Sequence, residues 1–259
     1  MAPSRMEKDM HELTHTPYRS WCPHCVRMRG RSTAHKKQVH KEKSWVPRIS
    51  FDYFFFSQED EHANKNPMIV MVDEETGEKY ARGVSQKGIG EDGEMKWLID
   101  DMQRELKSRG HPGGESSHLI FKSDGEASIK VVGDKLARQI GGKVVVESPA
   151  QGESQSNGLV EEAGKTVREF ARLFKDVIET KTRMKIKSKD HILMWAIRWA
   201  AMVTSRHLVG KDGLTAQERK RGRRCRAPVA AFGELVWYRP MDKARDRNKM
   251  EATWGNVSG

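Results

Sequence analysis

Three carboxylates lie where a sheet and a helix could bring them to one place. Asp52 stands inside the aromatic run ISFDYFFF, Asp124 follows the apolar run HLIF, and Glu161 opens an amphipathic stretch. A carboxylate among aromatic side chains costs desolvation free energy unless it is paired or binds a metal. Carboxylate oxygens are the ligands that Mg²⁺ and Mn²⁺ prefer. If the three converge, the sequence predicts a divalent-metal site suited to phosphoryl transfer.

Each acid taken alone also has an ordinary interpretation. Asp124 precedes Gly125, and aspartate is common in turns because its side chain bonds the nearby backbone. Asp52 would be unremarkable beside a basic partner, and Glu161 would be unremarkable on a solvated helix face. The joint arrangement of the three acids therefore carries the prediction.

The elements that must position these acids follow from hydrophobic periodicity and turn signals. Strands alternate with helices after a leading three-stranded segment, which predicts an antiparallel meander extended by parallel strands in one α/β layer. The predicted strands are 48–56, two within 67–86 joined by a turn at 75–77, one from His118, and 143–149. The predicted helices are 93–110, 127–142, 159–182 and 190–209, and the charged 58–66 and the polar 150–158 are predicted loops.

The bulk properties restrict the class of protein. The 259 residues carry a formal net charge of +11, which favours an acidic partner such as nucleic acid. Three cysteines are too few for a disulfide scaffold and indicate a reducing, intracellular setting. No apolar run approaches the ~20 residues that span a bilayer, so we expect no membrane partner.

A second set of chemically capable residues lies near the N-terminus. His11 and His15 are followed by Cys22 and Cys25, and thiolates with imidazoles form tetrahedral Zn²⁺ sites. The other candidate histidine ligands are His24, His35 and His40, and the ordinary alternative is a basic arm with free cysteines.

Three stretches resemble the catalytic core of retroviral and LTR-retrotransposon integrases: FDYFFF, IFKSDGEAS and SPAQGESQSNGLVEEAGKTVREF. The 36 residues between Asp124 and Glu161, and the ending QSNGLVE, are similar to the family's spacing and third motif. The family usually has asparagine after its second aspartate, whereas this chain has Gly125 and then Glu126. CPHCVRMRGR similarly resembles part of the family's zinc-binding module.

The resemblance implies a ribonuclease H-like fold with Asp52, Asp124 and Glu161 as the catalytic triad holding two Mg²⁺ or Mn²⁺ ions. Neighbours on a helix point about 100° apart, so only one of Glu161 and Glu162 can face the site. The position in the third motif favours Glu161. The resemblance also implies that Lys165 and Arg168, four and seven residues after Glu161, contact DNA.

Loop residues Gln155 and Asn157 would then add polar contacts to DNA, while a pairing of Glu161 with Lys165 is the alternative for the basic helix face. The implied domains are a zinc-binding-like segment (1–44), the catalytic core (45–209) and a basic tail with part of a C-terminal DNA-binding region (210–259). The RKRGRRCR run in this basic tail suits phosphate binding by charge.

The implied activity is 3′-end processing followed by strand transfer, performed by a homo-oligomer in the nucleus. Two alternatives stay open on the sequence. One is a decayed or domesticated core that binds nucleic acid without cutting it. The other is a ribonuclease H-like nuclease that acts on RNA–DNA hybrids.

Overall fold

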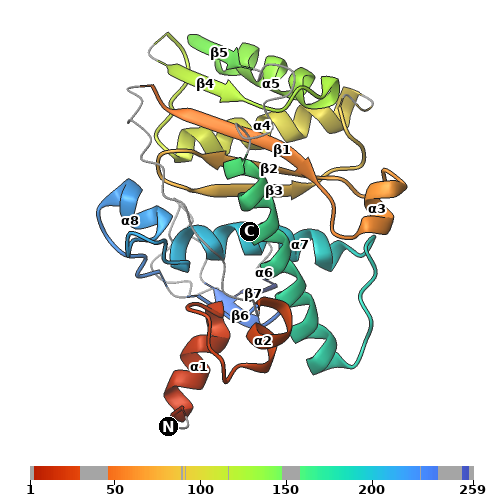
Figure 1. The fold of residues 1–259 in the computed structure, drawn as a ribbon, viewed down its shortest axis with the longest axis vertical. Helices are drawn as coiled ribbons and strands as arrows, with labels where there is room; N and C mark the ends of the chain where they lie inside the picture. Colours follow the sequence, from red (N-terminus) through yellow and green to blue (C-terminus); the bar gives the residue numbers. More distant parts are fainter. Residues whose placement is uncertain are drawn as a thin grey trace.

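A five-stranded mixed sheet forms the centre of the computed structural model, in the order β3-β2-β1-β4-β5 (Figure 1). The first three strands pair antiparallel, and β4 and β5 extend the sheet in parallel with β1. This is the ribonuclease H-like mixed sheet that the sequence predicts. The strands are β1 (Arg48–Phe54), β2 (Met68–Asp73), β3 (Lys79–Gly83), β4 (His118–Lys122) and β5 (Lys143–Glu147). The structure describes residues 3–29, 46–88, 90, 92–115, 117–147, 158–227, 229–238 and 253–256.

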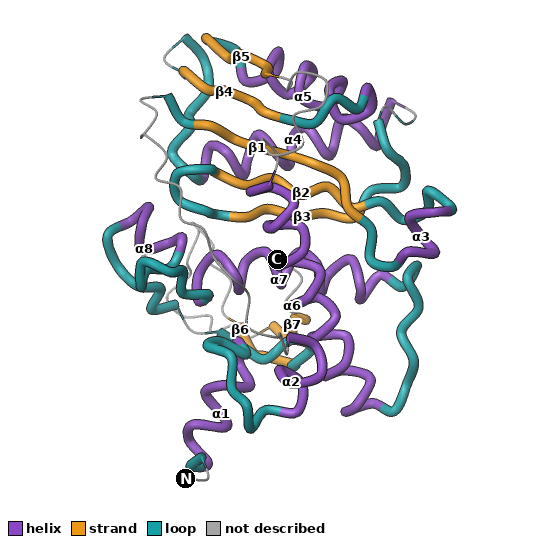
Figure 2. Tube along the Cα trace, viewed as in Figure 1, coloured by secondary structure: helices purple, strands orange, loops and turns teal. Residues whose placement is uncertain are grey.

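Helices cover both faces of this sheet (Figure 2). On one face, α4 (Asp92–Ser108) and α5 (Ala127–Ile140) bury their apolar sides against β1 and its neighbours. On the other, α6 (Gly158–Thr182) crosses the sheet with its N-terminal end, and α7 (His191–His207) packs between α6 and β3. The sequence-based helix bounds agree with these helices to within two residues at each end.

The alternation of side chains along β1 decides where Asp52 points. Phe51 and Tyr53 enter the core shared with α4 and α5. Phe54 packs on the opposite side, against the start of α6. Because strand side chains alternate, Asp52 faces α6 together with Phe54, as the sequence pattern predicts.

Of the two N-terminal helices, α1 (Arg5–Thr14) and α2 (Pro23–Arg29), the second packs on α6 (Figure 1). Cys22 and Cys25 are almost fully buried and belong to the same apolar cluster as Phe170 and Phe174 of α6. Sequence composition suggested that this segment had little to fill a core. In the structure, it shares the core formed by α6 and α7.

Four short elements lie where the sequence signals are weaker. The predicted loop 58–66 contains α3 (Gln58–His62), because the Ser57 hydroxyl accepts a hydrogen bond from the Asp60 backbone N–H and caps the helix. In the basic tail, Thr215 and Glu218 form a capping box that begins α8 (Ala216–Arg221). A two-stranded sheet joins β6 (Leu235–Tyr238) to β7 (Thr253–Asn256). The predicted loop 150–158 lies almost wholly outside the described residues.

The described helices include none whose length and apolar character would suit a membrane-spanning segment.

Candidate functional site

The strand register places Asp52 beside Asp124. Strand β1 pairs in parallel with β4, with Arg48 opposite Ile120 and Ser50 opposite Lys122. Two further residues along each strand lead to Asp52 and to Asp124. Parallel neighbours at equal register share one edge of the sheet, so the two carboxylates lie side by side.

The start of α6 brings Glu161 to the same place. Val160 and Ala163 pack on Val70 and Val72 of β2, on the sheet face toward which Asp52 points. The negative charge of Glu161 contributes to the raised pKa of Asp52. Glu162, one residue on, instead lines a separate small cavity between α6 and the N-terminal segment. The helix geometry thus turns Glu161, and not Glu162, toward the two aspartates.

Burial and mutual repulsion set the electrostatics of this site. Burial raises the pKa of Asp52 to about 7, and the charges of Asp124, Glu126 and Glu161 add to that rise. The backbone N–H of Tyr53, 2.7 Å from Asp52 Oδ1, opposes the rise by stabilising the ionised form. The three neighbouring acids give the site around Asp52 an excess of negative charge. A divalent cation would neutralise that charge.

Among the described residues, the three carboxylates have no basic partner. In the part of the chain that the structure describes, none of Asp52, Asp124 and Glu161 forms an ion pair with a lysine or arginine. Asp124 does hold a turn, since its Oδ1 accepts the Glu126 N–H at 3.0 Å. Its Oδ2 has no protein partner among the described residues. The turn role of Asp124 therefore leaves one oxygen for a ligand, and the oxygen-only donor set fits Mg²⁺ or Mn²⁺.

A fourth acid, Glu126, and its partner Lys87 complete the surroundings of the site. The Lys87 ammonium lies 2.9 and 3.2 Å from the two Glu126 oxygens, and the Ser128 hydroxyl donates to Glu126 at 2.6 Å. These contacts lower the pKa of Glu126 against the effect of its burial. In the sequence, Glu126 stands out only by its place after Asp124 and Gly125. Its partner Lys87 lies 39 residues away, so the sequence pattern alone could not identify the ion pair of Lys87 and Glu126.

The N-terminal segment brings together a second donor set. The ligand atoms of His11, His15, Cys22 and Cys25 all lie within 4.8 Å of one another, and all four side chains are buried. Cys25 Sγ lies 3.3 Å from His11 Nε2, and Cys22 Sγ lies 3.5 Å from His15 Nδ1. Zinc–sulfur and zinc–nitrogen bonds in a tetrahedron put such atoms about 3.6 Å apart. The arrangement therefore fits zinc closely.

The protonation of these groups also fits a metal. Burial lowers the pKa of His11 to about 4 and that of His15 to about 3, so both imidazoles are neutral and can donate a lone pair. Burial raises the pKa of the Cys25 thiol to about 11, so metal binding must displace its proton.

Of the alternative histidine ligands, His24 is used elsewhere. Its ring contacts Asp176 of α6, and Arg27 donates to the same carboxylate at 2.6 Å. His35 and His40 lie outside the described residues.

Comparisons with known proteins bear on the fold. No family model and no curated protein sequence matches the chain. Among solved structures, it is similar to a chain of the simian T-cell lymphotropic virus intasome in complex with PP2A regulatory subunit B56 gamma. That similarity has 14% identity over 91% of this chain and 76% of that chain, with a TM-score of 0.48. It is also similar to the HTLV-2 integrase catalytic core domain in complex with magnesium. Here the identity is 11% over 69% of this chain and 100% of that chain, with a TM-score of 0.45.

Helix α6 carries a row of basic residues beyond Glu161. Lys165 is exposed. Arg168 and Arg172 donate to the backbone oxygens of Phe55 and Phe56, at 3.3 and 2.5 Å, and so tie the helix to the end of β1. The sequence predictions named Lys165 and Arg168 but not Arg172. Arg172 lies four residues after Arg168 and so continues the same face of the helix.

Two predictions remain for this region: the pairing of Glu161 with Lys165, and the DNA contacts of Gln155 and Asn157. Within the described residues, Glu161 and Lys165 do not pair with each other, so the alternative of a simple ion pair between them does not hold. Gln155 and Asn157 lie outside the described residues.

The raised pKa of Asp52 predicts an unusual pH dependence of stability. The usual aspartate pKa of about 3.9 applies to the unfolded chain, so between about pH 4 and 7 the folded protein holds a proton that the unfolded chain releases. Without Mg²⁺ or Mn²⁺ beside Asp52, the protein therefore loses stability as pH rises through this window. We expect Asp52→Asn to stabilise the protein by roughly 1–3 kcal/mol at pH 8 and by almost nothing at pH 4.

Urea unfolding of zinc-loaded protein in magnesium-free buffer at both pH values measures this difference. Asp134→Asn, an exposed aspartate on α5, is the matched control. An equal effect of Asp52→Asn at pH 4 and pH 8 would contradict the prediction.

Proposed function

We propose that this protein is a metal-dependent polynucleotidyl transferase of the integrase type, which processes the 3′ ends of element DNA and joins them to target DNA. The observation that carries the proposal is the group of unpaired carboxylates at one sheet edge. Asp52 and Asp124 share a strand register, Glu161 approaches from α6, and burial together with the neighbouring negative charges raises the pKa of Asp52 to about 7. Structural acids are usually paired, whereas acids that bind metal are left free for the cation.

In this proposal, Asp52, Asp124 and Glu161 hold two Mg²⁺ or Mn²⁺ ions. When bound, such ions activate an attacking oxygen and stabilise the leaving one. Asp52 has to be ionised to contribute, and the Tyr53 N–H fixes one of its oxygens so that the other is directed outward. Asp124 is oriented in the same way by the Glu126 N–H. The pair of Lys87 and Glu126 borders the site and limits its excess negative charge.

DNA binding is part of the same proposal. The net charge of +11 and the exposed Lys165 on the Glu161 side of α6 favour a phosphate backbone near the carboxylates. Arg168, Gln155 and Asn157 are proposed to add contacts. We further propose that the protein acts as a homo-oligomer and in the nucleus, where its DNA substrates lie.

A strand-transfer assay tests this function. Zinc-loaded protein would be incubated with Mg²⁺ or Mn²⁺ and with oligonucleotides that carry the element's own ends, beside Asp124→Asn as the matched control. We expect joined products from the wild type only, and none without a divalent ion.

The two other functions predict different products. Binding of the same DNA with no products from either protein would favour a binding-only protein. Degradation of the RNA strand of a hybrid without any joining would favour a ribonuclease H-like nuclease. Either result would overturn the proposal.

A further inference from the structure

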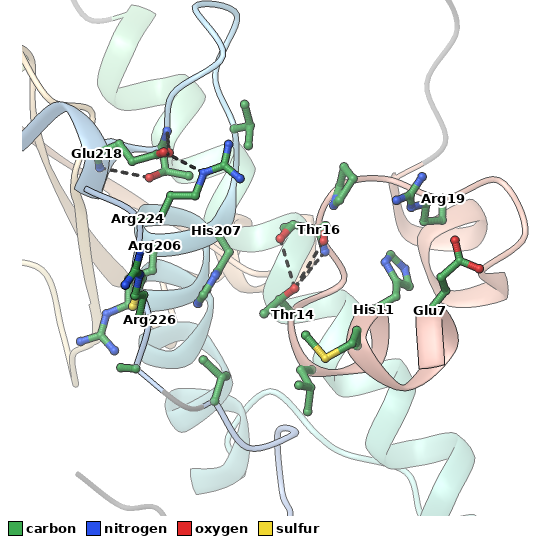
Figure 3. A pocket seen from close by; sticks show the side chains of 18 of the residues that line it. Glu7, His11, Thr14, Thr16, Arg19, Arg206, His207, Glu218, Arg224 and Arg226 are labelled. Carbon is green, nitrogen blue, oxygen red and sulfur yellow. Dashed lines mark hydrogen bonds and ion pairs between the residues drawn. The ribbon is translucent and has the colours of Figure 1, made fainter. Parts of the chain in front are cut away.

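A second functional surface lies away from the carboxylates, in a cavity between α1 and the C-terminal part of the chain (Figure 3). One wall comes from α1 and the loop that follows it. The other comes from the end of α7, from α8 and from residues 224–227 and 229. Its volume is about 890 Å³, within the range of sites that hold a ligand. We call it the arginine pocket, and nothing in the proposed catalysis uses it.

The pocket has a surplus of positive charge. It is lined by Arg19, Arg206, Arg224 and Arg226, which come from both walls. Arg224 pairs with Glu218 at 3.0 Å. The side chains of Arg19, Arg206 and Arg226 have no hydrogen-bond or ion-pair partner among the residues that the structure describes. Guanidinium groups gathered in a cavity without partners favour an anionic ligand, above all one with carboxylates or phosphates that accept two hydrogen bonds.

The acids of the pocket do not neutralise this charge. Glu7 accepts hydrogen bonds from the backbone N–H and the hydroxyl of Ser4, both at 2.8 Å, and so caps α1. Glu218 accepts the Thr215 N–H at 2.9 Å and caps α8, besides pairing with Arg224. Both carboxylates are therefore committed to the protein's own helices and to one of the four arginines.

A polar atom in the lining is also left without a partner. His207, at the end of α7, lines the pocket and lies between the two walls in Figure 3. Its Nε2 is buried and makes no hydrogen bond within the described residues. A ligand group that bonds this nitrogen would remove the cost of leaving it unpaired.

The apolar part of the lining decides the class of ligand. Met10 is 63% exposed, Val209 49% and Trp21 36%, although all three line one cavity. Apolar side chains grouped on a surface usually mark a place where a partner binds. Trp21 is the one large aromatic ring among the described lining residues, whereas sites for single-stranded nucleic acid use several rings to stack successive bases.

We propose that the arginine pocket binds a short acidic peptide segment of a partner protein, one that carries apolar side chains between its carboxylates. The carboxylates pair with Arg19, Arg206 and Arg226, and the apolar side chains cover Met10 and Trp21. The chain's own segments 30–45 and 239–252 are rich in lysine and arginine, so their charge excludes them as this ligand.

The experiment is a fluorescence-anisotropy titration of the zinc-loaded, full-length protein. The probe is a fluorescein-labelled peptide of alternating glutamate and leucine, run beside a peptide of alternating lysine and leucine and beside labelled single-stranded oligothymidine. The variants are Arg206→Gln and Arg226→Gln. The matched control is Arg138→Gln, which removes the same charge from an exposed position on α5, at the other end of the molecule.

We expect the acidic peptide to bind the wild type and Arg138→Gln equally, and to bind each pocket variant about tenfold more weakly, since each loses a charge-assisted hydrogen bond. The lysine–leucine peptide should not bind. Absence of binding of the acidic peptide, or equal binding by all variants, would overturn the proposal. So would tighter binding of oligothymidine that is lost in the same two variants, because the pocket would then be a nucleic-acid site. None of these outcomes depends on whether strand transfer occurs.

Discussion

Replacing Glu161 with glutamine is expected to lower the rate of strand transfer by more than about 100-fold. Removing a group that only orients a metal ligand typically lowers activity by about 10- to 100-fold, so a larger loss is expected for a ligand itself. Glutamine keeps the size of the side chain and its place in the first turn of α6, but it removes the negative charge. Glu161 is exposed and carries no structural ion pair within the described residues, so the substitution leaves the fold intact. The effect would therefore be on metal binding and chemistry and not on stability.

Glu162→Gln is the matched control for this prediction, because it makes the same change one residue along the helix. Glu162 lines the small cavity beside the N-terminal segment and points away from the aspartates. We expect strand transfer by Glu162→Gln to stay within about threefold of the wild type. The assay is the initial rate of strand transfer at saturating Mg²⁺, with thermal unfolding to show that both variants fold. Equal losses in the two variants would show that neither glutamate has a specific role.

We propose that the His11–His15–Cys22–Cys25 cluster holds zinc, and removing that zinc is expected to destabilise the α6 region as well as the N-terminal segment. Structural zinc in so small a segment supplies much of its folding free energy. Here the segment also packs on α6, where Cys22 and Cys25 share an apolar cluster with Phe170 and Phe174. We expect Cys25→Ser to release the zinc and to lower the free energy of unfolding by about 3 kcal/mol or more.

The measurement is zinc content by atomic absorption together with urea unfolding. Cys225→Ser is the control, since Cys225 is a free, partly exposed cysteine that does not belong to the cluster. A Cys25→Ser protein that keeps one equivalent of zinc and the wild-type unfolding midpoint would contradict the prediction.

The sequence predicts the central sheet well because its signals are local and strong. The alternation in β1 separates Phe51 and Tyr53 from Asp52, and the long amphipathic period of α6 marks nearly its full length. The order of strands and helices then restricts the topology, since parallel strands need crossover connections. The closeness of Asp52 and Asp124 depends in addition on the parallel pairing and register of β1 and β4, which the structure shows.

Other features could not be predicted because they depend on contacts between distant parts of the chain. The contact of His24 with Asp176 joins residues 152 positions apart, so no spacing rule distinguishes His24 from the metal ligands. Lys87 beside Glu126 and the arginine pocket belong to the same class. The helix α3 was missed for a different reason: GlnGluAspGluHis has no apolar face, and only its cap at Ser57 indicates a helix.

The position of α6 has a consequence for any attempt to shorten the protein. The helix has 25 residues, about 37 Å, with Glu161 near one end and the N-terminal segment against its middle, from Phe170 to Asp176. Arg29 stacks on the Phe170 ring at 4.1 Å, and His15 contacts Phe174. A truncated protein that began at residue 46 would leave these phenylalanines facing water on the helix that carries Glu161. Expression trials of the core alone would then yield aggregates, and a soluble fragment would need to retain residues 3–29.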